Sequence, residues 1–363
     1  MSHAFEPIRI RDLSIPNRLW MSPMCTYSAA PAGALTGAPT DFHFAHYTSR
    51  AAGGAGLIMI EATGVNPAGR ISAWDLGLWN DAQEQAFSRL TAAITAAGAV
   101  PAVQLAHAGR KASVDKPWLG GNPLDESGFG WASQGPSAVA FPGYPTPTEM
   151  SVEEIAQVVA DFAAATQRAL AAGFKAVEIH AAHGYLLHAF LSPLSNQRTD
   201  SYGGDFDGRS RLVVEIIDAV RAVWPAELPV FLRVSTTDWV DENPELQDAS
   251  WTIQDTIALS RVAAAHGVDL IDASSGGLIP THIPRDRDYQ TRYANQIRSE
   301  VGIPVAAVGR IDDAAWASEL LENGHADALF IGRAILRDAS WPNNAAVALG
   351  SDPRYVEQYA YAV

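Results

Sequence analysis

Two histidines, His180 and His183, stand three residues apart at the end of an apolar run, and Tyr185 follows them. Imidazoles at this spacing could hold a metal ion with a third ligand, or donate hydrogen bonds to an oxygen that gains negative charge. They could also be core histidines bonded to the backbone. Glu61 and Glu178 are candidates for a third metal ligand, but both lie inside strand-like runs, so we interpret them as structural.

A glycine-arginine pair follows each of the last two apolar runs of the chain, at Gly309-Arg310 and Gly332-Arg333. Glycine lets backbone N–H groups approach an anion, and arginine adds charge and a planar set of donors. The pattern predicts a phosphate site, although ion pairs with nearby aspartates (Asp312 or Asp338) would also explain the arginines. A phosphate site of this kind fits a phosphorylated substrate, FMN or pyridoxal phosphate. The last is disfavoured because no lysine lies at a predicted strand end.

Cys25 is the one cysteine of the chain. A single thiol excludes internal disulfides and four-cysteine iron–sulfur or zinc sites, and it favours a reducing compartment. A lone cysteine is usually a small buried hydrophobe. Cys25 nevertheless stands at the end of an apolar run beside Tyr27, which leaves a functional role open.

Composition and charge narrow the function further. Of the 363 residues, 48% are hydrophobic and 18% are charged, which is typical of a globular enzyme with a large core. The formal net charge of −15 disfavours binding to nucleic acid, and an anionic cofactor would need local arginines. No uncharged apolar run reaches the length of about 18 residues that spans a membrane, and the first residues lack the pattern of a signal peptide. We therefore expect a soluble, cytoplasmic protein that acts on small molecules.

Eight strand-like runs alternate with helical stretches and must position these residues. The runs cover residues 19–24, 57–63, 100–107, 176–180, 230–235, 270–273, 305–308 and 328–331. Most are continuously apolar, as in the buried strands of a parallel sheet. The alternation predicts a (βα)₈ TIM barrel, with an open doubly wound sheet as the alternative. In such a barrel the active site lies at the carboxyl ends of the strands, where the residues above stand together with Gln104 and Arg233.

The helices have recognisable ends in the sequence. Asp81 and Ser151 are each followed three residues later by an acid, which is the capping-box pattern of a helix start. Glycines mark the expected helix ends: Gly98, Gly173, Gly267 and Gly324.

Two segments fall outside the alternation of strands and helices. Residues 5–18 predict a small hairpin that covers the bottom of the barrel. Residues 110–150 are rich in Gly, Pro, Ser and Trp, and they predict a capping insertion after the third strand. Because no linker or repeat divides the chain, we expect residues 1–363 to form one domain.

Taken together, these residues resemble the Old Yellow Enzyme family of flavin ene reductases, and within it the bacterial branch with a cysteine near the flavin. The resembling stretches are residues 22–27, 41–47, 104–111, 180–185 and 191–204 and the two Gly-Arg pairs. They occur in the order and at the spacing of the family over nearly the whole chain. The resemblance implies a TIM barrel with FMN that passes hydride from NADPH or NADH, through flavin N5, to the β-carbon of an activated alkene such as an unsaturated carbonyl or nitro compound.

The resemblance also implies a role for each matched residue. Along the flavin ring would lie Ser22, Pro23, Met24 and Cys25, with Cys25 tuning the redox potential. The isoalloxazine would be contacted by Ala62, Gln104 and Arg233, with Arg233 offsetting charge at N1. The FMN phosphate would be held by Gly309, Arg310, Gly332 and Arg333. The substrate oxygen would bind His180 and His183, Tyr185 would donate the proton, and Tyr27 would shape the pocket.

Two positions depart from the family pattern. Gly208 stands where the family usually has Asn, which questions the packing at a helix start. Tyr359 and Tyr361 stand near the end of the chain, where the cysteine-bearing branch often has an arginine or aromatic residue that enters the neighbouring subunit's site. The resemblance implies a homodimer or homotetramer.

Three other functions compete with this interpretation. A dienoyl-CoA reductase needs a longer chain and several cysteines, so it is excluded. A metal-dependent barrel hydrolase would use His180 and His183 as ligands. A non-catalytic barrel would leave the reactive residues at the strand ends unexplained.

Overall fold

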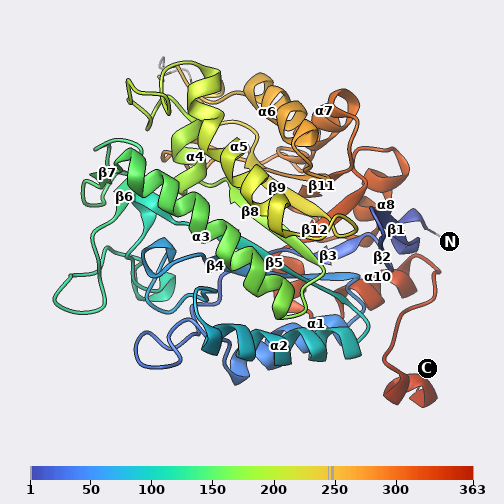
Figure 1. Cartoon of the computed structure of the whole chain (residues 1–363). Helices are drawn as coiled ribbons and strands as arrows, with labels where there is room; N and C mark the ends of the chain where they lie inside the picture. The colour runs from blue at the N-terminus through green and yellow to red at the C-terminus, as the bar shows by residue number, and fades with distance from the viewer. Residues whose placement is uncertain (1, 244, 247–248, 363) are drawn as a thin grey trace.

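Eight parallel strands close into a barrel in the computed structural model, which describes residues 2–243, 245–246 and 249–362 (Figure 1). The strands, in their order around the barrel, are β3 (Leu19–Met21), β4 (Leu57–Gly64), β5 (Val100–Ala106), β8 (Ala176–Ala181), β9 (Val230–Ser235), β10 (Leu270–Ser274), β11 (Val305–Val308) and β12 (Ala328–Ile331). Met21 of β3 is aligned with Ile58 of β4 and with Ile331 of β12, which closes the ring. The predicted TIM barrel is confirmed and the doubly wound sheet is wrong.

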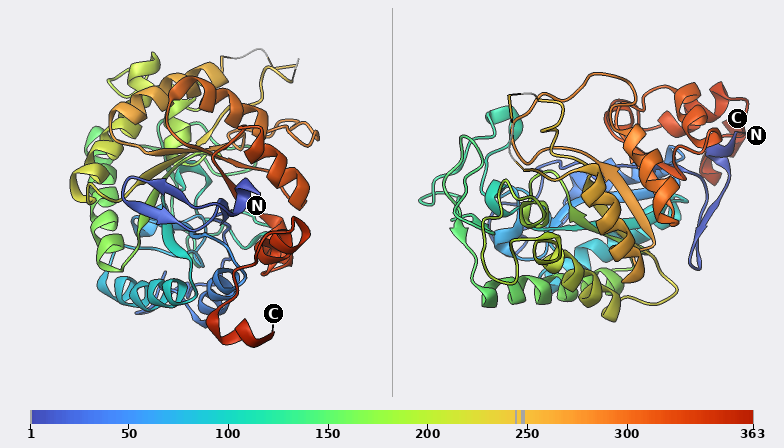
Figure 2. Two further views of the ribbon diagram at one scale, coloured as in Figure 1. Left: turned by 90° about the vertical axis from the view of Figure 1, so that its right-hand side faces the viewer. Right: turned by 90° about the horizontal axis from the view of Figure 1, so that it is seen from above.

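Helices surround the barrel (Figures 1 and 2). They are α1 (Asp41–Ala52), α2 (Asp81–Ala96), α3 (Val152–Ala171), α4 (Leu186–Leu191), α5 (Phe206–Val223), α6 (Ile253–Ala265), α7 (Thr291–Val301), α8 (Ala314–Glu322), α9 (Arg333–Arg337) and α10 (Trp341–Ala348). Short 3₁₀ turns are η1 (His3–Phe5), η2 (Pro67–Gly69), η3 (Gly109–Lys111), η4 (Pro117–Leu119) and η5 (Glu357–Ala362). None of the helices in the described ranges is long and apolar enough to span a membrane.

The predicted strand ends agree with the structure within one residue, except at β3. This strand ends at Met21, whereas the apolar run predicted that it continues to residue 24. Pro23 has no N–H to donate to a neighbouring strand, so the chain leaves the sheet before it. Residues 22–27 are therefore a loop above the barrel rather than a strand.

Helix α2 begins one residue earlier than predicted. Asn80, not Asp81, is the N-cap: its side chain accepts a hydrogen bond from Gln83 N, and Gln83 Oε1 accepts one from Asn80 N. Asn and Asp are equally good caps, and Asp81 is also favourable in the first turn, next to the positive end of the helix dipole. The predicted box of Ser151 and Glu154 at α3 is confirmed.

Glycines explain several further helix boundaries. Gly98 follows the C-cap of α2 with a φ of +89°, which glycine adopts without strain. The other predicted ends follow the same rule: Gly173, Gly267 and Gly324. At the start of α5, Asp205 accepts a hydrogen bond from Gly208 N, and a Cβ on Gly208 would lie 2.0 Å from Gly203 O. The departure from the family pattern therefore leaves the helix start intact, because the backbone approaches closely there.

A hairpin closes the amino-terminal end of the barrel, as predicted. β1 (Ile8–Ile10) and β2 (Leu13–Ile15) pair in antiparallel fashion and cross this end in the left view of Figure 2. Their isoleucines pack onto the apolar interior of the barrel, where Trp20 stacks on Phe231 with ring centroids 5.9 Å apart. The barrel interior is thus sealed at its bottom.

The segment between β5 and α3 is irregular, as the sequence predicts for residues 110–150. It contains η3, η4 and two short parallel strands, β6 (Gln134–Gly135) and β7 (Thr148–Glu149). Arg110 binds this segment to the loop after β10, because its Nη1 donates to Val139 O and its Nη2 to Leu278 O, at 3.1 and 2.6 Å. The segment therefore borders the carboxyl ends of the strands.

Candidate active site

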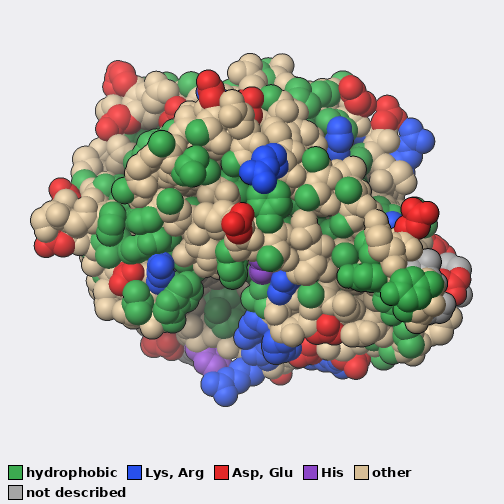
Figure 3. Space-filling model, turned by 90° about the horizontal axis from the view of Figure 1, so that it is seen from below, with side chains coloured by type: hydrophobic (Ala, Val, Ile, Leu, Met, Phe, Trp, Pro, Cys, Tyr) green, Lys and Arg blue, Asp and Glu red, His purple; other side chains and the backbone are tan. Residues whose placement is uncertain are grey.

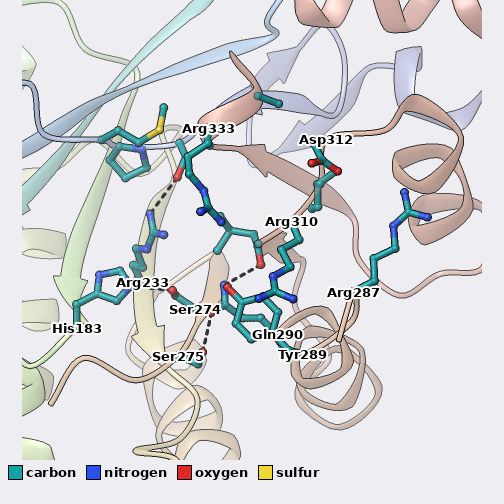
Figure 4. A pocket seen from close by; sticks show the side chains of 18 of the residues that line it. His183, Arg233, Ser274, Ser275, Arg287, Tyr289, Gln290, Arg310, Asp312 and Arg333 are labelled. Carbon is teal, nitrogen blue, oxygen red and sulfur yellow. Dashed lines mark hydrogen bonds between the residues drawn. The ribbon is translucent and has the colours of Figure 1, made fainter. Parts of the chain in front are cut away.

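A cavity of about 690 Å³ opens where β9 to β12 and β3 end. This volume is typical of a site for a cofactor or small ligand. The predicted site residues that line it are Ser22, Pro23, Met24, His183, Arg233, Gly309, Arg310, Gly332 and Arg333. Figure 4 shows His183 and Arg233 on one side of the cavity and Arg287 and Arg310 on the other.

The Gly-Arg pairs form a positively charged corner of this cavity. Within the described ranges, no carboxylate lies within ion-pair distance of Arg310 or Arg333, so ion pairs do not account for these arginines. Arg310 instead lies over the Tyr289 ring, with its guanidinium carbon 5.0 Å from the ring centroid. Gly309 has a φ of +115°, which a residue with a side chain rarely adopts. Arg310 Nη1 donates to the carbonyl of Asp286 at 3.3 Å. The bare backbone of Gly309 and the two guanidinium groups without carboxylate partners suit an anion.

Lys and Arg side chains also gather beside a hollow on one face of the molecular surface (Figure 3). The formal net charge of the chain is −15, so this locally positive surface has the opposite sign to the protein as a whole. Local positive charge is what an anionic cofactor needs on an acidic protein.

His180, His183 and Tyr185 lie together at the end of β8. The ring centroids of His180 and His183 are 5.1 Å apart, and those of His180 and Tyr185 are 5.2 Å apart, both with edge-on geometry. His180 Nδ1 accepts a hydrogen bond from Ala182 N at 3.3 Å, so Nε2 carries the hydrogen. His183 Nε2 lies 2.7 Å from Ser274 Oγ.

The two imidazoles are neutral. Burial, and next the positive charge of Arg233, lower the pKa values of His180 and His183 well below the usual value. Within the part of the chain that the structure describes, no group of three His, Cys, Asp or Glu side chains is arranged to hold a metal ion. A neutral imidazole carries one N–H that can donate a hydrogen bond.

The turn that carries His183 has a strained backbone and is bound by the side chain of Lys111 from another segment. His183 has a φ of +60°, in the left-handed region that costs a residue with a side chain about 1–3 kcal/mol. Lys111 Nζ donates hydrogen bonds to the carbonyls of His183 and Gly277, at 2.9 and 2.8 Å. No lysine lies at a predicted strand end, but η3 brings Lys111 to the turn at His183.

Cys25, Tyr27 and Tyr185 are not among the residues that line this cavity. They pack against a buried cluster that includes Ala62 and Ile71. Burial raises the pKa values of all three groups, so the thiol and both phenols keep their protons. Tyr185 can therefore act as an acid.

Glu61 positions the loop that carries Cys25 and Tyr27. Its Oε1 accepts a hydrogen bond from Thr26 N at 2.8 Å, and its Oε2 accepts one from Tyr47 OH of α1 at 2.6 Å. Burial raises the pKa of Glu61 to about 7. The structural interpretation of Glu61 agrees with these contacts, which also explain the motif at residues 41–47.

Arg233 and Gln104 have acidic partners below the cavity. Arg233 Nη1 lies 3.3 Å from Asp272 Oδ2 and 3.4 Å from Ser22 Oγ. Gln104 Nε2 donates to Glu178 Oε1 at 2.8 Å. Arg233 Nε is buried and has no hydrogen-bond partner among the described residues, which leaves a donor for a ligand.

Other residues of the cavity were not predicted as site residues. They include Ser274, Ser275, Arg285, Arg287, Tyr289, Gln290 and Arg337. The two serines directly follow the sixth predicted strand, which was a usable signal. Gln290 bridges Ser275 Oγ and Val308 O at 2.7 Å each, but it lies in an irregular segment without periodicity.

The predicted residues Tyr359 and Tyr361 lie apart from the rest of the site. They belong to η5, and their exposed fractions are 57% and 91%. A role in a neighbouring subunit stays a prediction.

The arrangement fits FMN. The cavity offers a buried, unpartnered Arg233 donor at one side and the Arg310 and Arg333 guanidinium groups with the Gly309 backbone in a second corner. A flat ring with polar edges and a phosphate tail requires such a donor set.

Comparisons with known proteins agree with this fit. Residues 3–351 match the model of the NADH:flavin oxidoreductase / NADH oxidase family. The chain is 44% identical to an NADPH dehydrogenase of Bacillus subtilis (strain 168) over 98% of this chain and 97% of the relative. Among solved structures it resembles morphinone reductase (TM-score 0.77, 27% identity, covering 97% of this chain and 91% of that one). It likewise resembles an old yellow enzyme homologue from Zymomonas mobilis (TM-score 0.77, 27% identity, covering 97% and 94%).

The family match and the curated relative cover nearly the whole chain, and the similar structures share its barrel. The predicted resemblance to the Old Yellow Enzyme family is thereby confirmed. The chain belongs to the NADH:flavin oxidoreductase / NADH oxidase family, and it is an oxidoreductase with FMN as its cofactor and a nicotinamide as its electron donor.

Proposed function

We propose that this enzyme reduces activated alkenes, such as α,β-unsaturated carbonyl and nitro compounds. Family membership already rules out the metal-dependent hydrolase and the non-catalytic barrel. The observation that carries the proposal is the neutral donor pair His180 and His183 beside the protonated Tyr185, next to a cavity that fits FMN. Bound FMN supplies the hydride transfer from nicotinamide to alkene.

His180 and His183 bind the substrate's carbonyl or nitro oxygen. As hydride reaches the β-carbon, negative charge develops on this oxygen, and two fixed N–H donors stabilise it as an oxyanion hole does. Their low pKa values support this role, because neutral imidazoles keep one N–H each without a competing proton equilibrium near neutral pH. Tyr27 bounds the same pocket from the loop after β3.

Tyr185 donates a proton to the α-carbon of the substrate. Its raised pKa keeps the phenol protonated until a carbanion-like carbon forms beside it, which is what a general acid needs. The edge-on contact with His180 supports a position next to the bound oxygen.

The remaining predicted residues hold the cofactor. Arg233 and Gln104 contact the isoalloxazine, and Arg233 offsets the negative charge that reduction adds. Ser22, Pro23, Met24, Cys25 and Ala62 lie along the ring, and Gly309, Arg310, Gly332 and Arg333 bind the phosphate. The cavity lining, which includes all of these residues except Gln104, Cys25 and Ala62, supports these roles. The absence of carboxylate partners for Arg310 and Arg333 in the described ranges supports the phosphate site.

The resemblance and the composition support three further assignments. Residues 1–363 form one FMN-binding domain with a cap at 110–150. The enzyme works as a homodimer or homotetramer. The single cysteine supports a reducing, cytoplasmic compartment.

One anaerobic experiment tests the proposed function. The purified protein is examined by visible absorption, reduced with NADPH, and then mixed with cyclohexenone. We expect a flavin spectrum that bleaches with NADPH and returns with the enone. A flavin that bleaches but is not reoxidised would leave the cofactor in place and overturn the alkene-reductase assignment.

A further inference from the structure

Two buried carboxyl groups lie below the cavity and have no role in the proposed function. Glu178 of β8 and Asp272 of β10 have no exposed surface. Ala176 and Leu270, two residues earlier on each strand, belong to the apolar cluster inside the barrel. Residues two apart on a strand point to the same side, so both carboxyl groups point into the barrel.

These carboxyl groups belong to a chain of polar contacts that runs across four neighbouring strands. Gln104 of β5 donates to Glu178 at 2.8 Å, and Arg233 of β9 lies 3.3 Å from Asp272. Asp272 is close enough to Glu178 for its negative charge to raise the pKa of the Glu178 carboxyl group. The chain therefore joins Gln104 and Arg233, the two residues that the proposed function places against the flavin ring.

The charges in this chain do not balance if both carboxyl groups are ionised. Among the described residues, Arg233 is the cation with the largest effect on both carboxyl groups, Gln104 is uncharged, and the barrel interior below is apolar. His180, which is aligned with Arg233, is neutral. Two carboxylates against one guanidinium would leave a buried negative charge without a partner, which is strongly unfavourable.

One shared proton resolves this imbalance. Glu178 Oε2 and both oxygens of Asp272 have no conventional hydrogen-bond donor in the described ranges, so a proton on one carboxyl group can be donated to the other. Burial and the neighbouring Asp272 raise the pKa of Glu178 well above its usual value, whereas burial opposed by Arg233 raises that of Asp272 only to about 6. Glu178 is thus the protonated partner, and Asp272 is the carboxylate that faces Arg233.

We propose that Asp272, as the ionised member of its pair with Glu178, is a positioning residue that sets the redox potential of the flavin through Arg233. The carboxylate of Asp272 offsets part of the guanidinium charge and so weakens its hold on the reduced ring. Hydride brings two electrons and one proton to the ring, which gains one negative charge. Near neutral pH, Asp272 then takes up a second proton from water and becomes a carboxylic acid. The inference rests on the proposed contact between Arg233 and the ring.

The redox potential of the holoenzyme as a function of pH tests this inference. A two-electron couple shifts by about 30 mV for each tenfold change in its equilibrium constant. For the wild type we expect the redox potential to fall by about 59 mV per pH unit near neutral pH, which is a hundredfold change in the equilibrium constant of reduction. At alkaline pH the slope should decrease to about 30 mV per pH unit, a tenfold change. A slope of about 30 mV per pH unit throughout would overturn the uptake of the second proton.

Two matched variants separate the roles of the two carboxyl groups. Asp272→Asn removes the charge that faces Arg233. We expect its redox potential to rise by at least about 30 mV, a tenfold change in the equilibrium constant of reduction. The potential of this variant should change by about 30 mV per pH unit at all pH values. Glu178→Gln replaces a group that is already neutral, so it should follow the wild type. Equal shifts in both variants, or no shift in Asp272→Asn, would contradict the inference.

A second measurement decides the question if Asp272→Asn does not fold. Reduction of the wild-type holoenzyme by NADPH in weak buffer with a pH indicator counts protons directly, and we expect net uptake from water near neutral pH. No uptake would overturn the inference. Reoxidation of the reduced flavin by cyclohexenone in the same samples tests the proposed function separately. The inference about Asp272 and the proposed function can therefore fail independently of each other.

Discussion

His180 stands edge-on to Tyr185, with ring centroids 5.2 Å apart and ring planes at 79° to each other. The His183 ring is also edge-on to the His180 ring, with ring centroids 5.1 Å apart. All three side chains come from the six residues that end β8 and lead into α4. The two proposed oxygen-binding donors and the proposed acid are thus fixed relative to each other by one short segment of the chain, and this geometry makes their substitutions informative.

His180→Ala and His183→Ala should each keep the bound flavin and weaken the reduction of enones. Loss of one N–H donor to a developing oxyanion costs roughly 3 kcal/mol, or about a hundredfold in rate. Stopped-flow reoxidation of the reduced flavin by cyclohexenone measures this loss. His266→Ala is the control, because His266 is exposed and contacts Asp218 at the surface. Unchanged reoxidation in both site variants would contradict the assignment.

Tyr185→Phe should slow the reoxidation of flavin by the alkene and leave its reduction by NADPH unchanged. A general acid contributes roughly 10²–10⁴-fold, and the phenol has no part in hydride transfer from the nicotinamide. The two half-reactions are measured separately in anaerobic stopped-flow experiments. If both half-reactions slow equally, Tyr185 shapes the site and is not the proton donor.

Arg310→Ala and Arg333→Ala should weaken the binding of FMN to the apoprotein. A charge-assisted hydrogen bond contributes roughly 1.5–3 kcal/mol, which corresponds to about a 10- to 100-fold increase in the Kd for each variant. Quenching of flavin fluorescence measures the Kd. Riboflavin, which lacks the phosphate, should bind all forms alike. Arg9→Ala is the matched control, since Arg9 forms an exposed pair with Asp12 on the hairpin at the other end of the barrel.

His107→Gln should make the stability of the protein less sensitive to acid. Burial lowers the pKa of His107 to about 4 in the folded protein, against about 6.5 in the unfolded chain. The unfolded state therefore binds more protons below about pH 6.5, and stability is lost as the pH falls. Between about pH 7 and about pH 5 this one histidine should lower the free energy of unfolding by about 2 kcal/mol.

Denaturant unfolding at the two pH values measures the difference between wild type and His107→Gln. Gln can accept the hydrogen bond that His107 Nδ1 now accepts from Gly109 N, so the variant keeps this contact. An identical pH dependence in the two proteins would show that His107 does not contribute.

The barrel could be predicted from the sequence because its strands are buried on both faces. A continuous apolar run has the same limits as the strand that it forms, and β9, β11 and β12 begin and end where predicted. The end of β3 could not be predicted from hydropathy, because Met24 and Cys25 are as apolar as strand residues. The strand nevertheless ends before them, since Pro23 has no N–H for the hydrogen bonds between strands. Backbone pairing, not hydropathy, ends that strand.

The site was predictable where one strand end brings its own residues together, as at His180 and Tyr185. It was not predictable where distant segments meet. Gln290 enters the cavity from a loop without periodicity, and Lys111 reaches the turn at His183 across 72 positions of sequence. The pairing of Glu178 with Asp272 has no sequence signal either, because each acid lies alone in an apolar run.

The hairpin of β1 and β2 has a consequence for the order of events during turnover. Because it seals one end of the barrel with isoleucines, ligands reach the ring only from the opposite end. Nicotinamide and alkene must then use a single entrance and stack in turn on the same face. Under the proposed function, oxidised nicotinamide departs before the alkene enters. Steady-state kinetics should then be ping-pong, with each reactant inhibiting competitively when it is in excess.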